Sequence, residues 1–542
     1  MKNYILIMGL AGMMLLPGNG LMPLVDRDEP RFAQATREMI QRDEWVIPYF
    51  NNQYRFDKPV MIYWLMRASY VVFGQNEFAA RLPSVIVALL IALAIYEMGR
   101  KWFSVGVGLW AAVGWLTCLQ VFIHGRLAVA DMPMILAVVI SHWSIFELLE
   151  SPKRKWFYLL YGALAFGFLT KGPIAILCPA LTLILFRWVF WRKPMVWKNL
   201  RLHYGLPLMM TLIAFWGIPA LIQTQGKFWQ VGMNDHVVKR GMEVFNHRIF
   251  LPFYYIPTAL LSLFPWIAFL GAVWGALRKN WGEKNAFLIS WFAGPYLIFS
   301  LYATQLPHYV MPAFPAFFLL LGQGLHGHYF YRKWHRIFFW AVCGAGIALA
   351  AALIGAAWGE SFSKEIYFLR MVLFSLSGIV LCMTLMALLA KKELRWTVFM
   401  PVVAIALCAH VLGKNLRELS PAAQLSSVFK QLPKETQCYF QGFEEPSLIF
   451  YSNRQWQTFG GFSDIARRPS PQLVVSLREE IRLERYMKEN WNRWMKKNEQ
   501  PEETVTSFSS DALTNGYQRI TTIEGVNLAR SSWIKIEIFQ RF

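Results

Sequence analysis

Long apolar stretches alternate with short polar ones over the first three quarters of the chain. A membrane-spanning helix needs about 17 to 25 mostly apolar residues, and we find about thirteen such stretches. We read the first as a span that is retained rather than a cleaved signal peptide, since it has one basic residue and no clear cleavage site. The pattern predicts a polytopic α-helical membrane protein with spans near 4–22, 82–99, 105–123, 132–149, 156–170, 173–190, 205–222, 250–277, 286–303, 309–328, 337–358, 367–390 and 396–413.

The stretch between the first two spans, residues 23–81, has a different pattern. Residues 30–41 place Phe32 and Met39 on one helical face and Gln34 and Glu38 on another, which is typical of a helix at a membrane surface. Residues 59–73 predict a second, more apolar helix. We expect two interfacial helices that form the rim of a site open to lipid and water.

After residue 413 the sequence becomes mixed and polar, so we divide the chain into a membrane domain, 1–413, and a C-terminal domain, 414–542. Strand-like runs (QCYFQGF, SLIFY, PQLVVSL and WIKIEIFQRF) alternate there with a charged stretch, 478–500, that predicts a helix. This is enough chain for a small C-terminal α/β domain.

Composition supports the membrane assignment. Hydrophobic residues make up 56% of the chain and charged residues only 16%, while the net charge is +21. In a soluble protein such a charge would suggest that the protein binds nucleic acid. Here Lys and Arg cluster in alternate short loops, a pattern that sets the orientation of a protein in the membrane. The asymmetry predicts that loop 23–81, loop 223–249 and the C-terminal domain lie outside the cytoplasm, and we expect no nucleic-acid partner.

Two short segments of the first outer loop share one design, in which an acidic residue precedes a proline: Asp28-Glu29-Pro30-Arg31 and Asp57-Lys58-Pro59. Proline favours the first turn of a helix, and helix starts attract anions. The segments therefore predict two helix starts at which Arg31 and Lys58 hold a phosphate while an aspartate handles a proton or a metal. The alternative is that the acids only cap the helices.

Further polar residues fall on the same predicted side of the membrane, where charges are costly unless they face a cavity or a partner. Each also has a structural interpretation, such as a cap for Asp131, a helix-end lysine for Lys171 or an interfacial aromatic for Tyr309. The set comprises Arg126, Asp131, Lys171, Asp235, His236, Lys239, Arg240, His308 and Tyr309.

Missing motifs narrow the chemistry. The sequence has no GxxxxGK[ST] loop, no GxGxxG after a strand and no GxSxG, so we expect neither a nucleotide cofactor nor a serine nucleophile. The six cysteines lack the spacing of a metal site or a disulfide framework. Acids and phosphate-binding bases at a membrane surface favour transfer from a lipid-phosphate donor.

Several segments resemble the GT-C glycosyltransferases that use polyprenyl-phosphate sugars, specifically the aminoarabinose transferases of lipid A and the protein mannosyltransferase-like group. They are PLVDRDEPRFAQATREM, WVIPYFNNQYRFDKPVMIYW, GRLAVADMP, LTKGPIAIL, NDHVVKR and QLPHYVMPAFP. The resemblance implies a bacterial inner-membrane enzyme whose active site and C-terminal domain face the periplasm. It also implies an undecaprenyl-phosphate sugar donor and, as acceptor, lipid A or another envelope glycan.

The resemblance implies roles for individual residues. Asp28 and Asp131 are similar to the two catalytic acids, and Tyr309 to a tyrosine that lines the lipid-phosphate cavity. Asp57 and His236 are similar to a pair that binds a divalent metal, although an aspartate stands where we expect glutamate. The bases near the donor phosphate are represented by Arg31, Lys58, Lys171 and Arg240.

The expected reaction is an in-line displacement at the anomeric carbon, with the polyprenyl phosphate leaving. Asp28 then acts as general base toward an acceptor hydroxyl, or positions an acceptor phosphate and stabilises positive charge on the sugar. A transferase for a protein or another glycan is an alternative. So is a transporter or flippase of lipid-linked sugars, which would need the bases but no acid.

Overall fold

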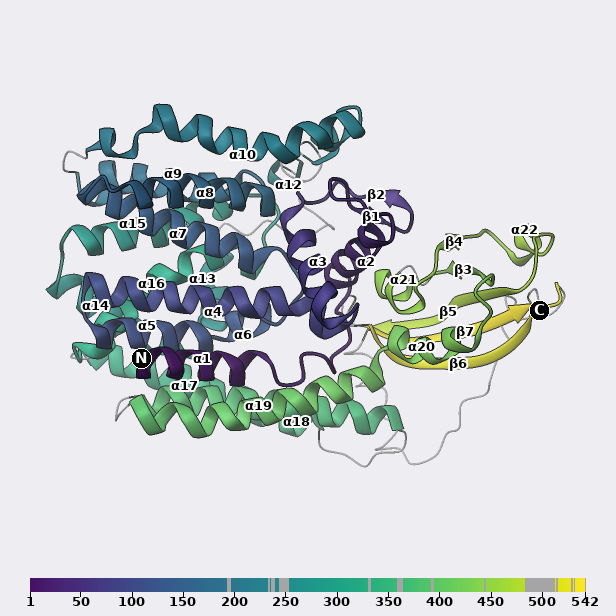
Figure 1. The fold of residues 1–542 in the computed structure, drawn as a ribbon. Coiled ribbons are helices and arrows are strands. Elements are labelled where there is room, and N and C mark those ends of the chain that lie inside the picture. The colour runs from purple at the N-terminus through teal and green to yellow at the C-terminus, as the bar shows by residue number, and fades with distance from the viewer. Residues whose placement is uncertain are drawn as a thin grey trace.

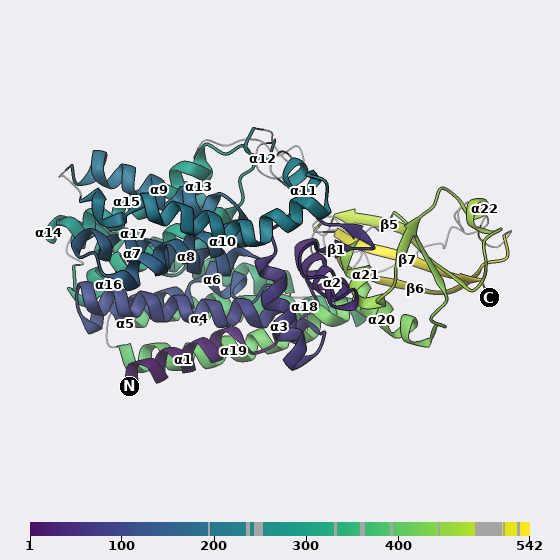
Figure 2. The same cartoon turned by 45° about the horizontal axis from the view of Figure 1, so that its top comes forward.

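The computed structural model shows a bundle of long helices that run side by side, with a smaller sheet-containing unit at one end (Figure 1). It describes residues 1–192, 196–232, 234, 239–242, 253–329, 333–357, 364–390, 394–442, 445–482, 512, 515–527, 530 and 532–541. The two interfacial segments lie between the bundle and the sheet unit, as the tilted view in Figure 2 also shows.

Each apolar stretch coincides, within the described chain, with one helix or a run of consecutive helices. The single helices are α1 (Lys2–Leu15), α4 (Glu77–Trp102), α7 (Asp131–Glu150), α8 (Arg154–Lys171), α10 (Leu202–Gln223), α15 (Glu283–Ser300), α17 (Lys333–Ala357), α18 (Lys364–Leu389) and α19 (Leu394–Leu419). The divided ones are α5 (Val105–Thr117) with α6 (Leu119–His124), α9 (Ile174–Leu185) with η1 (Phe186–Phe190), α13 (Tyr255–Ser262) with η5 (Trp266–Phe269) and α14 (Leu270–Lys279), and η6 (Pro307–Ala313) with α16 (Phe314–His326). Short helices η2 (Trp197–Leu200), α11 (Lys227–Trp229) and α12 (Lys239–Met242) lie in the connections.

Five helices in the described part of the chain are long and apolar enough to cross a membrane, and a bent pair would make six. These are fewer than the predicted spans: some stretches are divided into shorter helices, and others, such as α1, form one helix that is too short. The stretch 250–277 differs most from a straight span, since its helices meet at 108° around Leu263 to Pro265. The chain is a multi-pass membrane protein, and the number of crossings stays a prediction.

The two interfacial segments form helices α2 (Asp28–Gln41) and α3 (Met61–Phe73), with a small hairpin, β1 (Tyr49–Phe50) and β2 (Gln53–Tyr54), between them. The middle of the expected polar face of α2 does not face water, which corrects part of the sequence interpretation, while Gln41 at its end is exposed. Gln34 and Glu38 are buried, because the hairpin turn and the sheet unit cover them. Glu38 accepts hydrogen bonds from the backbone N–H groups of Asn51 and Asn52.

The first acid-proline segment starts its helix as predicted, with Asp28 and Glu29 in the first turn of α2. The second does not. Helix α3 begins at Met61 with Val60 as its N-cap, and that N-cap has no side-chain hydrogen bond. The Asp57 carboxylate binds two neighbouring cations.

The sheet unit contains five strands in the order β4-β3-β5-β7-β6, of which β4, β3 and β5 are parallel and β7 and β6 antiparallel to their neighbours. Two sequence interpretations were wrong here. The run SLIFY is helical, since Pro446 favours a helix start, and the stretch from 478 begins as strand, because β5 keeps pairing with β7 through Arg482. The rest of that stretch, 483–500, lies outside the described residues. The elements are α20 (Pro421–Gln431), β3 (Gln437–Gln441), α21 (Pro446–Ser452), β4 (Trp456–Thr458), α22 (Phe462–Ile465), β5 (Gln472–Arg482), β6 (Gln518–Asn527) and β7 (Ser532–Arg541).

The bundle core fixes α7, whose first residue is the candidate acid Asp131. His142 of α7 stacks on Trp291 of α15 with ring centroids 4.2 Å apart, and one of its ring nitrogens lies 2.9 Å from the hydroxyl of Thr182 on α9. All three residues are buried, so the hydrogen bond satisfies polar groups that would otherwise be costly in the interior.

Candidate active site

The candidate residues gather where the bundle meets the interfacial helices. They come from the start of α2, the turn before α3, the start of α7, the end of α8 and η6. In Figures 1 and 2, α2 and α3 lie at the end of the bundle that faces the sheet unit. Residues as far apart in the sequence as Asp28 and Tyr309 thereby share one region, since both interact with Lys171.

Asp28 is the exposed acid of this region. Among the described residues it has no hydrogen bond or ion-pair partner, although it interacts electrostatically with Arg31, Arg55 and Lys171. A carboxylate that has no direct partner keeps both oxygens for a substrate. This is the arrangement that a general base or a charge-stabilising acid needs.

Asp57 bridges two cations. Its Oδ2 lies 2.9 Å from the guanidinium of Arg55 and its Oδ1 lies 3.0 Å from Nζ of Lys58. Arg55 also donates to the hydroxyl of Tyr63 at 3.0 Å and lies over the ring of Phe32. Asp57 therefore holds Lys58 and Arg55 beside the start of α2.

Arg55 was missed by the sequence interpretation, although its spacing from Asp57, with one residue between, was a usable signal. Burial works against its charge, but Tyr63 and Asp57 more than offset this and raise the pKa of Arg55. Burial, and then the nearby Arg55, lower the pKa of Arg31. A bound anion such as a phosphate would stabilise two guanidinium groups that lie this close together, because it offsets their mutual repulsion.

Asp131 and Lys171 form a second charged pair, with Nζ 2.5 Å from Oδ1. The Lys171 ammonium lies 5.5 Å from the ring centre of Tyr309, so three predicted residues come together. Two histidines stand beside them: the rings of His124 and His308 are 4.7 Å apart, and both interact electrostatically with Asp131. His124 was missed because it ends an apolar stretch, where a single histidine gives little signal.

Two other charges have structural roles. Glu29 is buried, forms a two-point ion pair with Arg81 and accepts from the N–H groups of Val25 and Ala128. Arg126 donates to the carbonyl oxygens of Met14 and Pro17 at the end of α1. Through these contacts Glu29 and Arg126 fix the backbone around the site.

The expected metal pair, Asp57 and His236, stays a prediction, because the structure describes only Asp57. Both oxygens of Asp57 already bind cations, and no described group of three His, Cys, Asp or Glu side chains could hold a metal ion. The expected second ligand, His236, lies outside the described residues, as does Asp235. The backbone of Arg240 belongs to α12, while its side chain is not among those described.

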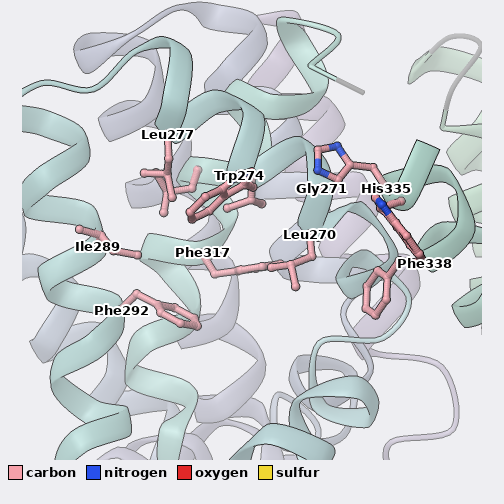
Figure 3. A pocket seen from close by; sticks show the side chains of 12 residues that line it. Leu270, Gly271, Trp274, Leu277, Ile289, Phe292, Phe317, His335 and Phe338 are labelled. Carbon is pink, nitrogen blue, oxygen red and sulfur yellow. The ribbon is translucent and has the colours of Figure 1, made fainter. Parts of the chain in front are cut away.

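A large apolar cavity lies elsewhere, between α14, α15, α16 and α17. It has a volume of about 400 Å³ and is lined by Leu270, Trp274, Phe317 and similar side chains, with His335 at its edge (Figure 3). None of the candidate acids or bases lines it, so it is separate from the charged site.

The chain is similar to known proteins in both sequence and fold. Residues 57–218 match the family model for dolichyl-phosphate-mannose-protein mannosyltransferase. The chain is 31% identical over 373 residues to the undecaprenyl phosphate-alpha-4-amino-4-deoxy-L-arabinose arabinosyl transferase of Enterobacter sp. (strain 638), covering 66% of each protein. It is 32% identical over 322 residues to the protein of that name from Erwinia tasmaniensis, covering 57% of this chain and 56% of the relative.

Solved structures match over nearly the whole chain. The crystal structure of ArnT from Cupriavidus metallidurans bound to undecaprenyl phosphate superposes with a TM-score of 0.75 at 18% identity, covering 98% of this chain and 97% of that one. The apo crystal structure of that protein gives a TM-score of 0.71 at 20% identity, covering 87% and 92%. At this identity the likeness concerns the fold, and the sequence matches span less than two thirds of the first relatives' own length. The partial family match, the relatives and the shared fold agree in one direction: the chain resembles membrane glycosyltransferases such as the aminoarabinose transferases and the protein mannosyltransferases.

Proposed function

We propose that this protein transfers a sugar from undecaprenyl phosphate to lipid A or another envelope acceptor at the outer face of the bacterial inner membrane. The sugar is 4-amino-4-deoxy-L-arabinose or a related one, as the names of the relatives suggest. The observation that carries the proposal is the exposed carboxylate of Asp28, which has no direct partner among the described residues and lies amid the cations Arg31, Arg55 and Lys171.

The proposed topology follows from the loop charges. About thirteen crossings place both interfacial helices, the site and the C-terminal α/β domain (414–542) on the periplasmic side. The sheet unit and the interfacial helices lie at the same end of the bundle, which supports this orientation (Figure 1). The membrane domain, 1–413, would then carry the chemistry.

The proposed reaction is an in-line displacement at the anomeric carbon. The bond from this carbon to the phosphate oxygen of the donor breaks as a bond to an acceptor oxygen forms. Arg31, Lys58 and Arg240 stabilise the charge that grows on the leaving phosphate, where the transition state differs most from the bound donor. A guanidinium such as Arg55, already crowded against Arg31, would assist them.

The acids have distinct proposed roles. Asp28 removes the proton of an acceptor hydroxyl, or positions an acceptor phosphate and stabilises positive charge on the sugar. Asp131, held by Lys171, orients that lysine toward the phosphate and the ring of Tyr309. Asp57 holds Lys58 and Arg55, and no step in this mechanism passes through a metal ion.

A reconstituted assay tests the proposal. Purified protein in vesicles receives undecaprenyl phosphate carrying 4-amino-4-deoxy-L-arabinose, with lipid A as acceptor, and mass spectrometry follows lipid A. We expect lipid A to gain the mass of one sugar residue. If no acceptor gains a sugar while the donor moves between leaflets, a transporter replaces the transferase.

A further inference from the structure

Helix α21 of the sheet unit lies directly against α2, the helix that begins at Asp28 (Figures 1 and 2). The two helices are more than 400 residues apart in sequence (446 − 41 = 405). Their contact is polar as well as apolar, and some of its polar side chains, such as Arg37 and Ser447, are buried. This is unusual for a domain that is merely tethered, because buried polar groups require matched partners.

The start of α21 is held by Asp26, two residues before Asp28. The Asp26 carboxylate accepts from the backbone N–H of Ser447 at 2.9 Å and from its hydroxyl at 2.5 Å. An acid at this position satisfies a free N–H group and interacts favourably with the positive end of the helix. The link joins the sheet unit to the backbone immediately before the candidate acid.

The other end of α21 is held by Arg37 of α2. Its guanidinium donates to the carbonyl oxygen of Phe450 at 2.7 Å and lies 4.2 Å from the centre of the Phe450 ring. It also donates to Gln34 on its own helix and to Gln75 before α4. A cation interacts favourably with the negative end of a helix, and a guanidinium stacks on an aromatic ring in a defined orientation. Both interactions fix the position of Arg37 relative to α21.

Two further contacts complete the interface. Asn51, in the hairpin turn, exchanges a pair of hydrogen bonds with the backbone of Trp456, at 3.0 and 3.1 Å. Tyr451 accepts from the N–H of Leu24 at 3.0 Å and donates to Glu77 at 3.2 Å. The interface thus contacts the first outer loop before, along and after α2.

We propose that α21 positions the transferase site. The start of α21 binds Asp26 and its end binds Arg37, and these two contacts fix the position of α2 and therefore of Asp28. Asp26 and Arg37 are thus positioning residues. The expected effect on catalysis rests on the proposed function, because it requires that Asp28 takes part in sugar transfer. Neither residue needs to touch the substrate. Displacing a catalytic group by a fraction of its contact distance is enough to slow a reaction strongly.

The test compares Arg37→Met with Arg37→Lys and with a matched control, Arg519→Met, in the full-length protein in vesicles. Arg519 lies on β6 and binds Glu537 of β7, so its loss removes an arginine ion pair from the sheet unit and none of the contacts between α21 and α2 described above. Two readouts are taken: the kcat and donor KM of sugar transfer, and amide hydrogen exchange of residues 26–41.

We expect Arg37→Met to lower kcat about tenfold or more while donor KM changes by less than about twofold, because the acid is displaced and the phosphate site is kept. Amides of residues 26–41 should exchange faster. Arg37→Lys, which keeps a cation over Phe450, should recover part of kcat, and Arg519→Met should match the wild type. Asp26→Ala, at the other end of α21, should act in the same direction.

Wild-type kcat in both Arg37→Met and Asp26→Ala would overturn the inference, as would unchanged exchange across residues 26–41. If Arg37→Met does not fold, Asp26→Ala carries the test alone. A wild-type protein without transfer activity would instead defeat the proposed function, and the exchange measurement would still decide whether α21 holds α2.

Discussion

The carboxylate of Glu29 and the guanidinium of Arg81 form a two-point ion pair in the interior, at 2.8 and 2.7 Å. The side chains are 2% and 0% exposed. Arg81 also donates to the carbonyl oxygens of Asn19, Met22 and Pro23, and Glu29 accepts from the N–H of Ala128. The pair thus ties the start of α2 to the end of the first apolar segment and to the loop before Asp131.

This pair predicts a large effect of Glu29→Gln on stability. Removing one partner leaves the other charge buried and uncompensated, which costs about 3 to 5 kcal/mol. We expect a clear fall in the midpoint of thermal unfolding in detergent. In the double variant with Arg81→Met the fall should be smaller than the sum of the single effects, because no lone charge remains. A midpoint for Glu29→Gln equal to that of the wild type would contradict the structural role.

Lys58→Ala should weaken donor binding more than folding. Asp57 keeps its contact with Arg55 in this variant, so the turn before α3 retains an ion pair. We expect donor KM to rise about tenfold, the equivalent of about 1.4 kcal/mol, with little change in unfolding temperature. The matched control is Lys227→Ala, an exposed lysine in the predicted loop 223–249. Equal KM values for the Lys58 variant and the control would remove Lys58 from the phosphate site.

Asp131 and Lys171 should behave as one unit in catalysis. We expect Asp131→Asn and Lys171→Met each to lower kcat about tenfold or more, since each breaks the 2.5 Å ion pair. The double variant should be little worse than either single one, because interacting residues are not additive. Transfer assays on the four proteins measure this coupling. Effects that multiply would mean that the two residues act independently.

The interface at Asp26 should make stability depend on pH. Burial, and then the neighbouring Glu445, raise the pKa of Asp26 to about 7, while the hydrogen bonds from Ser447 and, less strongly, the charge of Arg31 act in the opposite direction. The folded protein therefore binds this proton more tightly than the unfolded chain does. Its contribution to stability is greatest at low pH and is lost as the pH rises from about 4 to about 7. The side chain in Asp26→Asn cannot ionise. We therefore expect the thermal unfolding midpoint of this variant to lack the fall that the wild type shows as the pH rises through this range. Identical pH profiles for variant and wild type would exclude Asp26 as the cause.

Local chemistry explains what the sequence could predict. The start of α2 at Asp28 follows from two acids and a proline, and the helices follow from apolar length. The sequence pointed to Asp131, Lys171 and Tyr309 because polar groups at membrane depth are costly unless they face a cavity or a partner. Their pairing could not be read from the sequence, since it depends on how α7, α8 and η6 pack.

Distant contacts explain what the sequence interpretation missed. Gln34 and Glu38 looked solvent-exposed because nothing local shows that α21 covers their face. The run SLIFY looked like a strand because a short apolar run fits both structures. His124 and Arg55 gave weak signals on their own, and only the fold shows that His124 stands against His308 and that Arg55 binds Asp57.

The most direct test of the central claim is mass spectrometry of lipid A from cells that carry the wild-type protein, Asp28→Asn or no copy. The asparagine keeps the shape of the side chain and removes its charge, and Asp28 has no described partner whose loss would disturb the fold. We predict that the sugar mass on lipid A is present with the wild type and absent in the other two strains, with the variant protein at normal levels in the membrane. Full modification of lipid A by Asp28→Asn would contradict the account.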